Sequence, residues 1–211
     1  MKLYQSFGPN PRVVTMYIAE RGLDIPRAFL DIQAGENRTP EMLALNPSGG
    51  TPFLETGGGI TLPDSLAICE YFEDYFGNSA LLGETAAERA QTQAMMRRID
   101  QSVIVPMSNA FRSAEGLAMF QSRMFCCPEA AEGNKAYCRD GLIQIEKQFG
   151  DGPWLLGERF SLADIMLYCF ADFGGMVAQP LPSECSKLSE WTIRVRARGS
   201  AEISANPQNG L

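Results

Sequence analysis

The stretch NPSGGTPFLETGGGITLPDSLAICEYFEDYF (residues 46–76) contains two short apolar runs and one longer amphipathic run. The runs TPFLE and GITL flank a glycine-rich turn, which predicts a β-hairpin with strands over residues 51–55 and 59–62. The apolar spacing that follows predicts a helix over residues 64–76. We therefore expect a hairpin and a helix to close the first domain.

The residues before this stretch alternate between strand and helix patterns. Strands are predicted over residues 2–5 and 27–32, and helices over residues 11–21 and 39–45. The order βαβ, then α, then a hairpin and a helix suits an α/β domain whose four-stranded mixed sheet has helices on both faces. We assign this domain to residues 1–77.

The rest of the chain has the pattern of a helical bundle. Helices are predicted over residues 86–117, 134–149, 161–177 and 188–198. Pro106 is expected to kink the first of these helices. The motif FSLADI predicts a capping box, Ser161 with Asp164, which has a structural role at a helix start. We assign residues 86–211 to one all-helical domain.

Composition excludes several functions. The chain has 211 residues and a formal charge of −7, which argues against a nucleic-acid partner because phosphate binding needs clustered Lys and Arg. The absence of histidine excludes a Ser-His-Asp triad, a Cys-His pair and histidine-containing zinc sites. Neither a signal peptide nor a membrane-spanning apolar run is recognisable, so we expect a soluble cytoplasmic protein without a membrane partner.

The cysteine pattern indicates reduced thiols. The six cysteines form no CxxC pair, and they are Cys69, Cys126, Cys127, Cys138, Cys169 and Cys185. This usage is typical of a reducing compartment. The adjacent pair Cys126-Cys127 is interpreted as part of a loop, since a metal site needs three or four ligands. No metal site is predicted.

Three polar motifs of the first domain are candidates for a ligand site. Asn10 in SFGPNP is predicted to be the N-cap of the first helix. A cis Thr51-Pro52 bond would present the Thr51 backbone to a peptide-like ligand. Asp64 and Ser65 stand at a helix start, where they either cap the helix or receive the charged end of a ligand. Each motif alone is explained by capping, but their joint occurrence indicates a ligand site.

These motifs carry a resemblance to a known family. With GENRTPEMLALNPSGGTPFLE, LPDSLAICEYFE and FSLADI, the chain resembles the cytosolic glutathione S-transferases of bacterial type over essentially its whole length. The resemblance implies a thioredoxin-like first domain that binds glutathione as co-substrate, a helical second domain that contributes the acceptor pocket, and a homodimer. It implies a glutathione transferase whose thiolate attacks a small hydrophobic electrophile. The alternatives are a glutathione-dependent disulfide reductase and a non-catalytic scaffold module.

The resemblance also assigns roles to individual residues. Thr51, which precedes Pro52, would bind the cysteinyl backbone of glutathione, and Asp64 with Ser65 would bind its γ-glutamyl end. Arg38 in GENRTPE stands where relatives with GEHKSPE use a lysine for the glycyl carboxylate. A guanidinium at that place can pair bidentately with a carboxylate.

The second domain is expected to contribute further contacts. Asp100 in MRRIDQ matches an acidic residue that, in many bacterial relatives, reaches across the dimer to the amino group of glutathione. Phe7, Met107 and Phe111 are candidates for the apolar wall around the acceptor substrate. The alternative for Met107 and Phe111 is a place in the core, as is usual at helical spacing.

The group that activates the thiol is where the chain departs from many relatives. Gly8 stands where relatives with SPxxxRV carry an activating serine, whereas Asn10 matches the asparagine of TPNG-type transferases. A free cysteine thiol has a pKa of about 8.5, which helix-start donors lower. An amide donates to a thiolate without ionising, so Asn10 is the predicted stabiliser and Ser6 the alternative.

Overall fold

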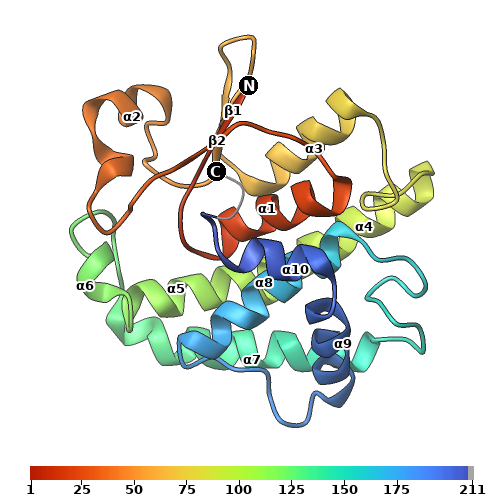
Figure 1. Ribbon diagram of the computed structural model, residues 1–211. Helices are drawn as coiled ribbons and strands as arrows, with labels where there is room; N and C mark the ends of the chain where they lie inside the picture. The colour runs from red at the N-terminus through yellow and green to blue at the C-terminus, as the bar shows by residue number, and fades with distance from the viewer. Residues whose placement is uncertain (209–211) are drawn as a thin grey trace. The chain divides into compact units, whose positions relative to one another are not determined.

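The chain folds into two compact units in the computed structural model, which describes residues 1–208. The first unit consists of Met1–Ser79 and the segment that begins at Arg196, and the second is Ala80–Val195 (Figure 1). The sequence-based division placed the whole C-terminal part in the helical domain. The structure differs at that end because the last helix packs on the first helix of the chain.

The strands of the first unit form the predicted mixed sheet. They are β1 (Lys2–Gln5), β2 (Arg27–Phe29), β3 (Phe53–Glu55) and β4 (Thr61–Leu62). Among residues 1–208 they make one four-stranded sheet of order β2-β1-β3-β4. Strands β1 and β2 are parallel, whereas β3 is antiparallel to both β1 and β4. Leu3 of β1 pairs with Leu54 of β3, and both side chains are fully buried.

Helices cover both faces of this sheet, as expected for a thioredoxin-like unit. They are α1 (Pro9–Arg21), η1 (Glu36–Arg38), α2 (Pro40–Leu45), α3 (Ser65–Phe76) and α10 (Gly199–Ala205). Helices α1 and α3 lie on one side of the strands and α2 lies on the other (Figure 1). A buried carboxylate, Glu73 of α3, joins the first two, since it accepts hydrogen bonds from Tyr17 and Arg21 of α1 at 2.5 and 2.6 Å.

Helix α10 was not predicted, and its contacts explain why it belongs to the first unit. Arg198 binds both carboxylate oxygens of Glu20 on α1, at 2.7 and 2.6 Å, and Ser200 donates to the same carboxylate. The Gln5 side chain of β1 donates to the backbone carbonyl of Pro207. A bidentate guanidinium–carboxylate pair is geometrically specific, so these contacts fix α10 against α1.

The second unit is helical, as predicted. Its elements are α4 (Ala86–Ile99), η2 (Asp100–Ile104), α5 (Val105–Ser113), α6 (Leu117–Phe120), η3 (Pro128–Ala130), α7 (Ala131–Gln148), α8 (Leu162–Met176) and α9 (Ser186–Arg196), whose last residue is at the boundary. Helix α5 packs along α7, and α4 packs against α8. Helix α8 is central, because residues 162–171 are all buried.

The long helix predicted over residues 86–117 is interrupted. A π-helical turn, η2, separates α4 from α5 just before Pro106. Pro106 has no N–H to donate to the carbonyl of Ser102 four residues earlier, so the regular helical bond is missing there. Gly141 of α7 lies against that carbonyl, since a Cβ on Gly141 would be 2.1 Å from the Ser102 oxygen. The break therefore coincides with the close approach of α7.

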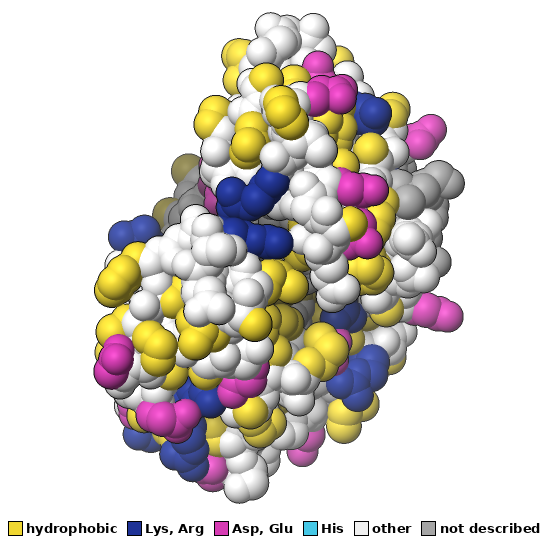
Figure 2. All heavy atoms as spheres, turned by 90° about the vertical axis from the view of Figure 1, so that its left-hand side faces the viewer, with side chains coloured by type: hydrophobic (Ala, Val, Ile, Leu, Met, Phe, Trp, Pro, Cys, Tyr) yellow, Lys and Arg dark blue, Asp and Glu magenta, His cyan; other side chains and the backbone are white. Residues whose placement is uncertain are grey.

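Charged side chains of both signs lie among apolar ones on the face of the molecule shown in Figure 2. Several large apolar side chains are exposed, including Phe7 and Phe125 at 54% and 90%. Within the part of the chain that the structure describes, we find no helix whose length and apolar content would let it cross a bilayer.

Candidate functional site

The SFGPNP turn connects β1 to α1 in a way that the sequence did not predict. Gly8 is the N-cap of α1, Pro9 is the first helical residue and Asn10 is the second. The prediction that Asn10 caps this helix is therefore wrong. The physical reason is that Gly8 adopts a φ of 126°, which disfavours other residues, while the fixed φ of Pro9 suits a first helical position.

The first turn of α1 leaves few donors. Pro9 and Pro11 have no backbone N–H, and the N–H of Arg12 bonds to the Gly8 carbonyl at 3.3 Å. Gly8 supplies no side-chain cap. Asn10 thus holds the one backbone N–H in this turn that has no partner among residues 1–208. Because the two prolines lack an N–H, Asn10 supplies the free backbone hydrogen-bond donor at this helix start.

The side chain of Asn10 is oriented by α3. Its Oδ1 accepts a hydrogen bond from the Ser65 hydroxyl at 3.4 Å, although the two residues are 55 positions apart. Ser65 is buried, so its own position is fixed by the start of α3. With Oδ1 facing Ser65, the amide N–H₂ faces away, and within the described chain it has no partner. The structure therefore brings together two of the predicted site residues.

Ser6 lies at the end of the same turn nearest the sheet. Its side chain is 1% exposed, and the hydroxyl has no hydrogen-bond partner among the residues that the structure covers. An unsatisfied buried hydroxyl costs free energy, so this group is unusual for a folded protein. Phe7 follows with an exposed ring whose edge contacts Phe29 at 5.0 Å between ring centroids.

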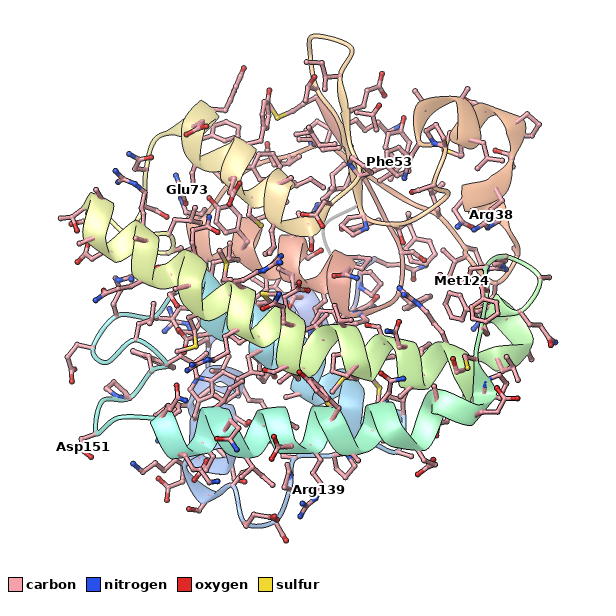
Figure 3. The ribbon with its side chains drawn as sticks, turned by 180° about the vertical axis from the view of Figure 1, so that it is seen from behind. Arg38, Phe53, Glu73, Met124, Arg139 and Asp151 are labelled. Atoms are coloured by element: carbon pink, nitrogen blue, oxygen red, sulfur yellow. The ribbon has the colours of Figure 1, made fainter. Side chains whose placement is uncertain are left out.

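The Thr51-Pro52 peptide bond is cis, as predicted. Strand β3 begins directly afterwards, and its Phe53 pairs with Tyr4 of β1 in the sheet. Figure 3 shows Phe53 within the sheet region. Thr51 therefore precedes the paired residues, and its backbone is outside the β1–β3 ladder.

Two asparagines that the sequence analysis missed hold the loop before Thr51. Asn37 donates to the carbonyl of Gly49 at 2.5 Å, and Asn46 donates to that of Gly50 at 2.9 Å. Both side chains are buried. The signal was present in part, since Asn46 stands in NPSGG, a typical turn sequence in which Asn bonds its own backbone two residues on. These residues position the loop and do not themselves face outward.

Arg38 is the last residue of η1 and is exposed. Its guanidinium carbon lies against Gly49, because a Cβ on that glycine would be 3.3 Å from it. Arg38 is labelled in Figure 3. Across residues 1–208 the guanidinium makes no ion pair or hydrogen bond. It is therefore available to bind an anionic group bidentately.

Asp64 is the N-cap of α3. One oxygen, Oδ1, accepts from the backbone N–H groups of Leu66 and Ala67, both at 2.9 Å. The capping interpretation is thus confirmed for this oxygen. The side chain is exposed, and its second oxygen accepts no hydrogen bond from the described residues. Oδ1 of Asp64 therefore caps the helix, and the other oxygen is free to accept a hydrogen bond from a ligand.

The remaining predicted site residues belong to the helical unit. Asp100 is half-buried at the start of η2. Met107 is fully buried, and its terminal methyl lies 2.8 Å from where a Cβ on Gly174 would be, so the structure places it in the core and does not support it as a pocket wall. Phe111 is half-buried and makes an edge contact with Phe173, at 5.1 Å between ring centroids.

The FSLADI motif forms the predicted capping box. Asp164 accepts from the backbone and hydroxyl of Ser161 at 2.9 and 2.8 Å, and also from Leu155 N and Trp191 Nε1, both at 2.9 Å. Burial raises the pKa of Asp164 above its ordinary value, although these donors oppose the shift. Both carboxylate oxygens are occupied by the protein itself, so the role of this motif is structural.

Comparison with known families matches both parts of the chain. Residues 7–74 match the glutathione S-transferase N-terminal domain, and residues 128–194 match the glutathione S-transferase C-terminal domain. A maleylacetoacetate isomerase of Pseudomonas aeruginosa is 30% identical over 170 residues, which cover 79% of this chain and 78% of that protein. The chain therefore belongs to the glutathione S-transferase family, and it is a glutathione transferase with glutathione as co-substrate.

A yeast relative and two solved structures support the same family assignment. Glutathione S-transferase 2 of Saccharomyces cerevisiae is 27% identical over 197 residues, covering 92% of this chain and 84% of that protein. The crystal structure of Gtt2 from Saccharomyces cerevisiae superposes with a TM-score of 0.88 at 27% identity, covering 97% of this chain and all of that one. A glutathione S-transferase domain-containing protein of Marinobacter aquaeolei has a TM-score of 0.87 at 28% identity, covering 95% and 99% of the two chains.

Proposed function

We propose that this transferase uses Asn10 to stabilise the glutathione thiolate, which then attacks a small hydrophobic electrophile. The observation that carries the proposal is the Asn10 amide, whose Oδ1 is held by Ser65 and whose N–H₂ is left unpaired. Because Oδ1 faces Ser65, the N–H₂ group of Asn10 can donate only in the direction away from Ser65. A sulfur placed there would receive a charge-assisted hydrogen bond.

The start of α1 supports the same assignment. The unpaired backbone N–H of Asn10 and the positive end of the helix dipole both favour a negative charge near the turn. A thiol of ordinary pKa, about 8.5, would ionise more readily there and release its proton to solvent. The thiolate then forms a bond to the electrophilic carbon, and the electron pair of the broken bond leaves with the displaced group or stays on the acceptor. Ser6, with its unpaired hydroxyl, is the alternative donor.

The rest of glutathione would be held by its two charged ends. Arg38 would pair with the glycyl carboxylate, and the free oxygen of Asp64 with the γ-glutamyl ammonium. The Ser65 hydroxyl already donates to Asn10, and the N–H groups of Leu66 and Ala67 donate to Asp64. The γ-glutamyl carboxylate would therefore be received by the backbone N–H of Ser65, at the start of α3. The Thr51 backbone, outside the strand ladder, would pair with the cysteinyl residue.

The acceptor would lie against exposed or half-exposed aromatic rings. Phe7 is the strongest candidate, because it is exposed next to the Asn10 turn. Phe111 remains a candidate from the helical unit, whereas the buried Met107 is left out.

We also infer a homodimer. Tyr75 and Phe76 at the end of α3 are 61% and 41% exposed and form an edge-to-face pair, with ring centroids 4.9 Å apart. Exposed aromatic pairs are typical of protein interfaces. In such a dimer Asp100 would reach the glutathione of the other subunit. A monomer in sedimentation at micromolar concentration would contradict both inferences.

Disulfide reduction is the second candidate function. The SFGPNP turn contains no cysteine, so two glutathione molecules would supply both sulfurs for exchange with a disulfide substrate. Parallel assays with a chlorinated aromatic acceptor and with a disulfide acceptor distinguish the two reactions. A scaffold without catalysis is disfavoured, because it has no need for the unpaired groups of Asn10, Arg38 and Asp64.

The proposal is tested by replacing Asn10 with aspartate. Asn10→Asp keeps the size of the side chain and places a negative charge near the sulfur, so the bound thiolate should lose a stabilisation of about 1.5 to 3 kcal/mol relative to the thiol. This corresponds to a rise of roughly 1 to 2 in its pKa. The absorbance of the thiolate during a pH titration of the glutathione complex measures this shift.

The matched control is Asn109→Asp, an equal charge change at an exposed position of α5. It should leave the thiol pKa and turnover unchanged, and thermal unfolding should show that both variants are folded. If Asn10→Asp also leaves the thiol pKa and turnover unchanged, Asn10 is not the stabilising group, and Ser6→Ala becomes the next variant to measure.

A further inference from the structure

Cys126 and Cys127 are the accessible thiols of this protein. All six cysteines lie within the described residues, and none is in a disulfide. Four of them are buried with at most 1% exposure, namely Cys69, Cys138, Cys169 and Cys185. Cys126 and Cys127 are half-exposed in the segment between α6 and η3. The two adjacent thiols are not explained by packing or by the transferase site.

The segment that carries the pair is anchored to its own unit. The backbone N–H of Cys127 donates to the hydroxyl of Ser113 on α5 at 3.2 Å. The Cys127 thiol donates to the carboxylate of Glu129 at 3.4 Å, and the Cys126 thiol lies 3.7 Å from the carbonyl of Met124. Figure 3 shows Met124 in the loop next to α6. Two sulfurs are thus presented from an ordered stretch of backbone.

A disulfide is not the favoured state of this pair. The Cα atoms of neighbouring residues are about 3.8 Å apart, whereas disulfides usually join Cα atoms about 4.4 to 6.8 Å apart. A disulfide between Cys126 and Cys127 would be strained and easily reduced. In the presence of glutathione the pair therefore rests as a dithiol.

The pair also does not suit zinc. Structural zinc sites have four ligands, and among residues 1–208 there is no group of three or more Cys, Asp or Glu side chains that could hold a metal ion. The pair fits a thiophilic centre that needs only two thiolates. A trivalent arsenic atom that already carries one organic group meets this condition, because two sulfurs complete its three bonds.

We propose that Cys126 and Cys127 form a chelating site for trivalent organoarsenicals. Two S–H bonds and the arsenic–oxygen bonds of an arsenoxide break, two arsenic–sulfur bonds form, and the two protons leave with the oxygen as one water molecule. Arsenic stays trivalent, so no oxidant or reductant is consumed. The Glu129 carboxylate accepts the proton of Cys127 and passes it to the departing oxygen.

The surroundings favour an arsenical with an aromatic group. Phe125 directly precedes the pair and is 90% exposed, and Met124 is 44% exposed. An aryl ring on arsenic would contact the Phe125 ring in an edge-to-face or offset arrangement. The exposed side chains of Met124 and Phe125 would thus form an apolar contact surface for the organic group on arsenic.

The test is a titration of the reduced protein with phenylarsine oxide. We expect one adduct per chain by intact mass, located in the tryptic peptide of residues 124–135, which contains no other cysteine. Cys126→Ser and Cys127→Ser should each weaken binding roughly 100-fold or more, since the second sulfur then no longer binds intramolecularly. Both positions are half-exposed, and circular dichroism should show that the variants are folded.

Phe125→Ala is the matched control, because it keeps both thiols and removes only the aromatic contact. It should still form the adduct, with affinity reduced by a few-fold at most. Equal binding by wild type and the single-cysteine variants would overturn the proposal, as would an adduct located on a different peptide. None of these measurements requires glutathione, so the result is independent of the proposed catalytic role of Asn10.

Discussion

Helices α8 and α1 begin in opposite ways. At the start of α8, Asp164 is buried, and its two oxygens receive four hydrogen bonds from the protein. At the start of α1, Gly8 provides no side-chain cap, and inside residues 1–208 neither the side-chain N–H₂ of Asn10 nor the hydroxyl of Ser6 has a hydrogen-bond partner. One helix start is completed by the fold and the other is left open.

The start of α3 is intermediate between these two. One oxygen of Asp64 caps the helix while the other is unused. A buried polar group without a partner costs stability, and at the start of α1 the Ser6 hydroxyl carries this cost. The free oxygen of Asp64 does not, because that side chain is exposed to water. The same capping signature in a sequence can therefore be completed by the fold, as at Asp164, or leave one carboxylate oxygen free, as at Asp64. The state of the remaining polar atoms distinguishes the two.

The largest effect is expected at α8. Asp164→Ala would leave the buried Trp191 Nε1–H and Leu155 N–H without acceptors, at a cost of about 4 kcal/mol in the free energy of unfolding. Asp64→Ala should cost only about 1 kcal/mol, the usual value for an exposed N-cap, but should weaken glutathione binding. Urea unfolding and glutathione titration of both variants check this. Equal losses of stability would break the contrast between the two helix starts.

A smaller effect is expected for the open guanidinium of Arg38. Arg38→Ala should weaken glutathione binding by about 1.5 to 3 kcal/mol, the range for hydrogen bonds to charged groups, without loss of stability. Arg139→Ala is the matched control, because that exposed arginine already pairs with Glu184 in the helical unit. Calorimetry of glutathione binding separates the variants. Unchanged affinity in Arg38→Ala would mean that this side chain is only a surface charge.

The smallest effect concerns Glu20, which joins α1 to α10. Burial opposes its ionisation, but the bonds from Arg198 and Ser200 outweigh this and hold the pKa of Glu20 below its ordinary value of 4.5. Because folding lowers this pKa, the stabilisation is present above pH 4.5 and is lost as the pH falls further. Glu20→Gln should therefore cost about 1 kcal/mol at pH 7 and progressively less in acid.

Unfolding curves of wild type and Glu20→Gln between pH 7 and acid check this dependence. A stability difference that stays constant as the pH falls would show that the Glu20 carboxylate contributes through its shape and not through its charge. In that case Glu20 would stabilise the fold through hydrogen bonds that do not depend on pH in this range, and its role would be structural, like that of Asp164 at the start of α8.

Local patterns in the sequence determined much of this protein. The alternation of strand and helix signals predicted the mixed sheet, and Thr51-Pro52 and FSLADI predicted the cis bond and the capping box that the structure contains. These features depend on residues close together in the chain, such as Ser161 and Asp164, so spacing and residue type suffice to recognise them.

Tertiary structure decided what depends on distant contacts. The sequence placed Asn10 at the N-cap, because it could not say that Gly8 would adopt a positive φ. It did not show that Ser65 orients Asn10, or that Arg198 ties α10 to Glu20, since these partners are separated by 55 and 178 positions. Which polar atoms stay unpaired depends on packing between distant segments, and local spacing contains no information about that packing.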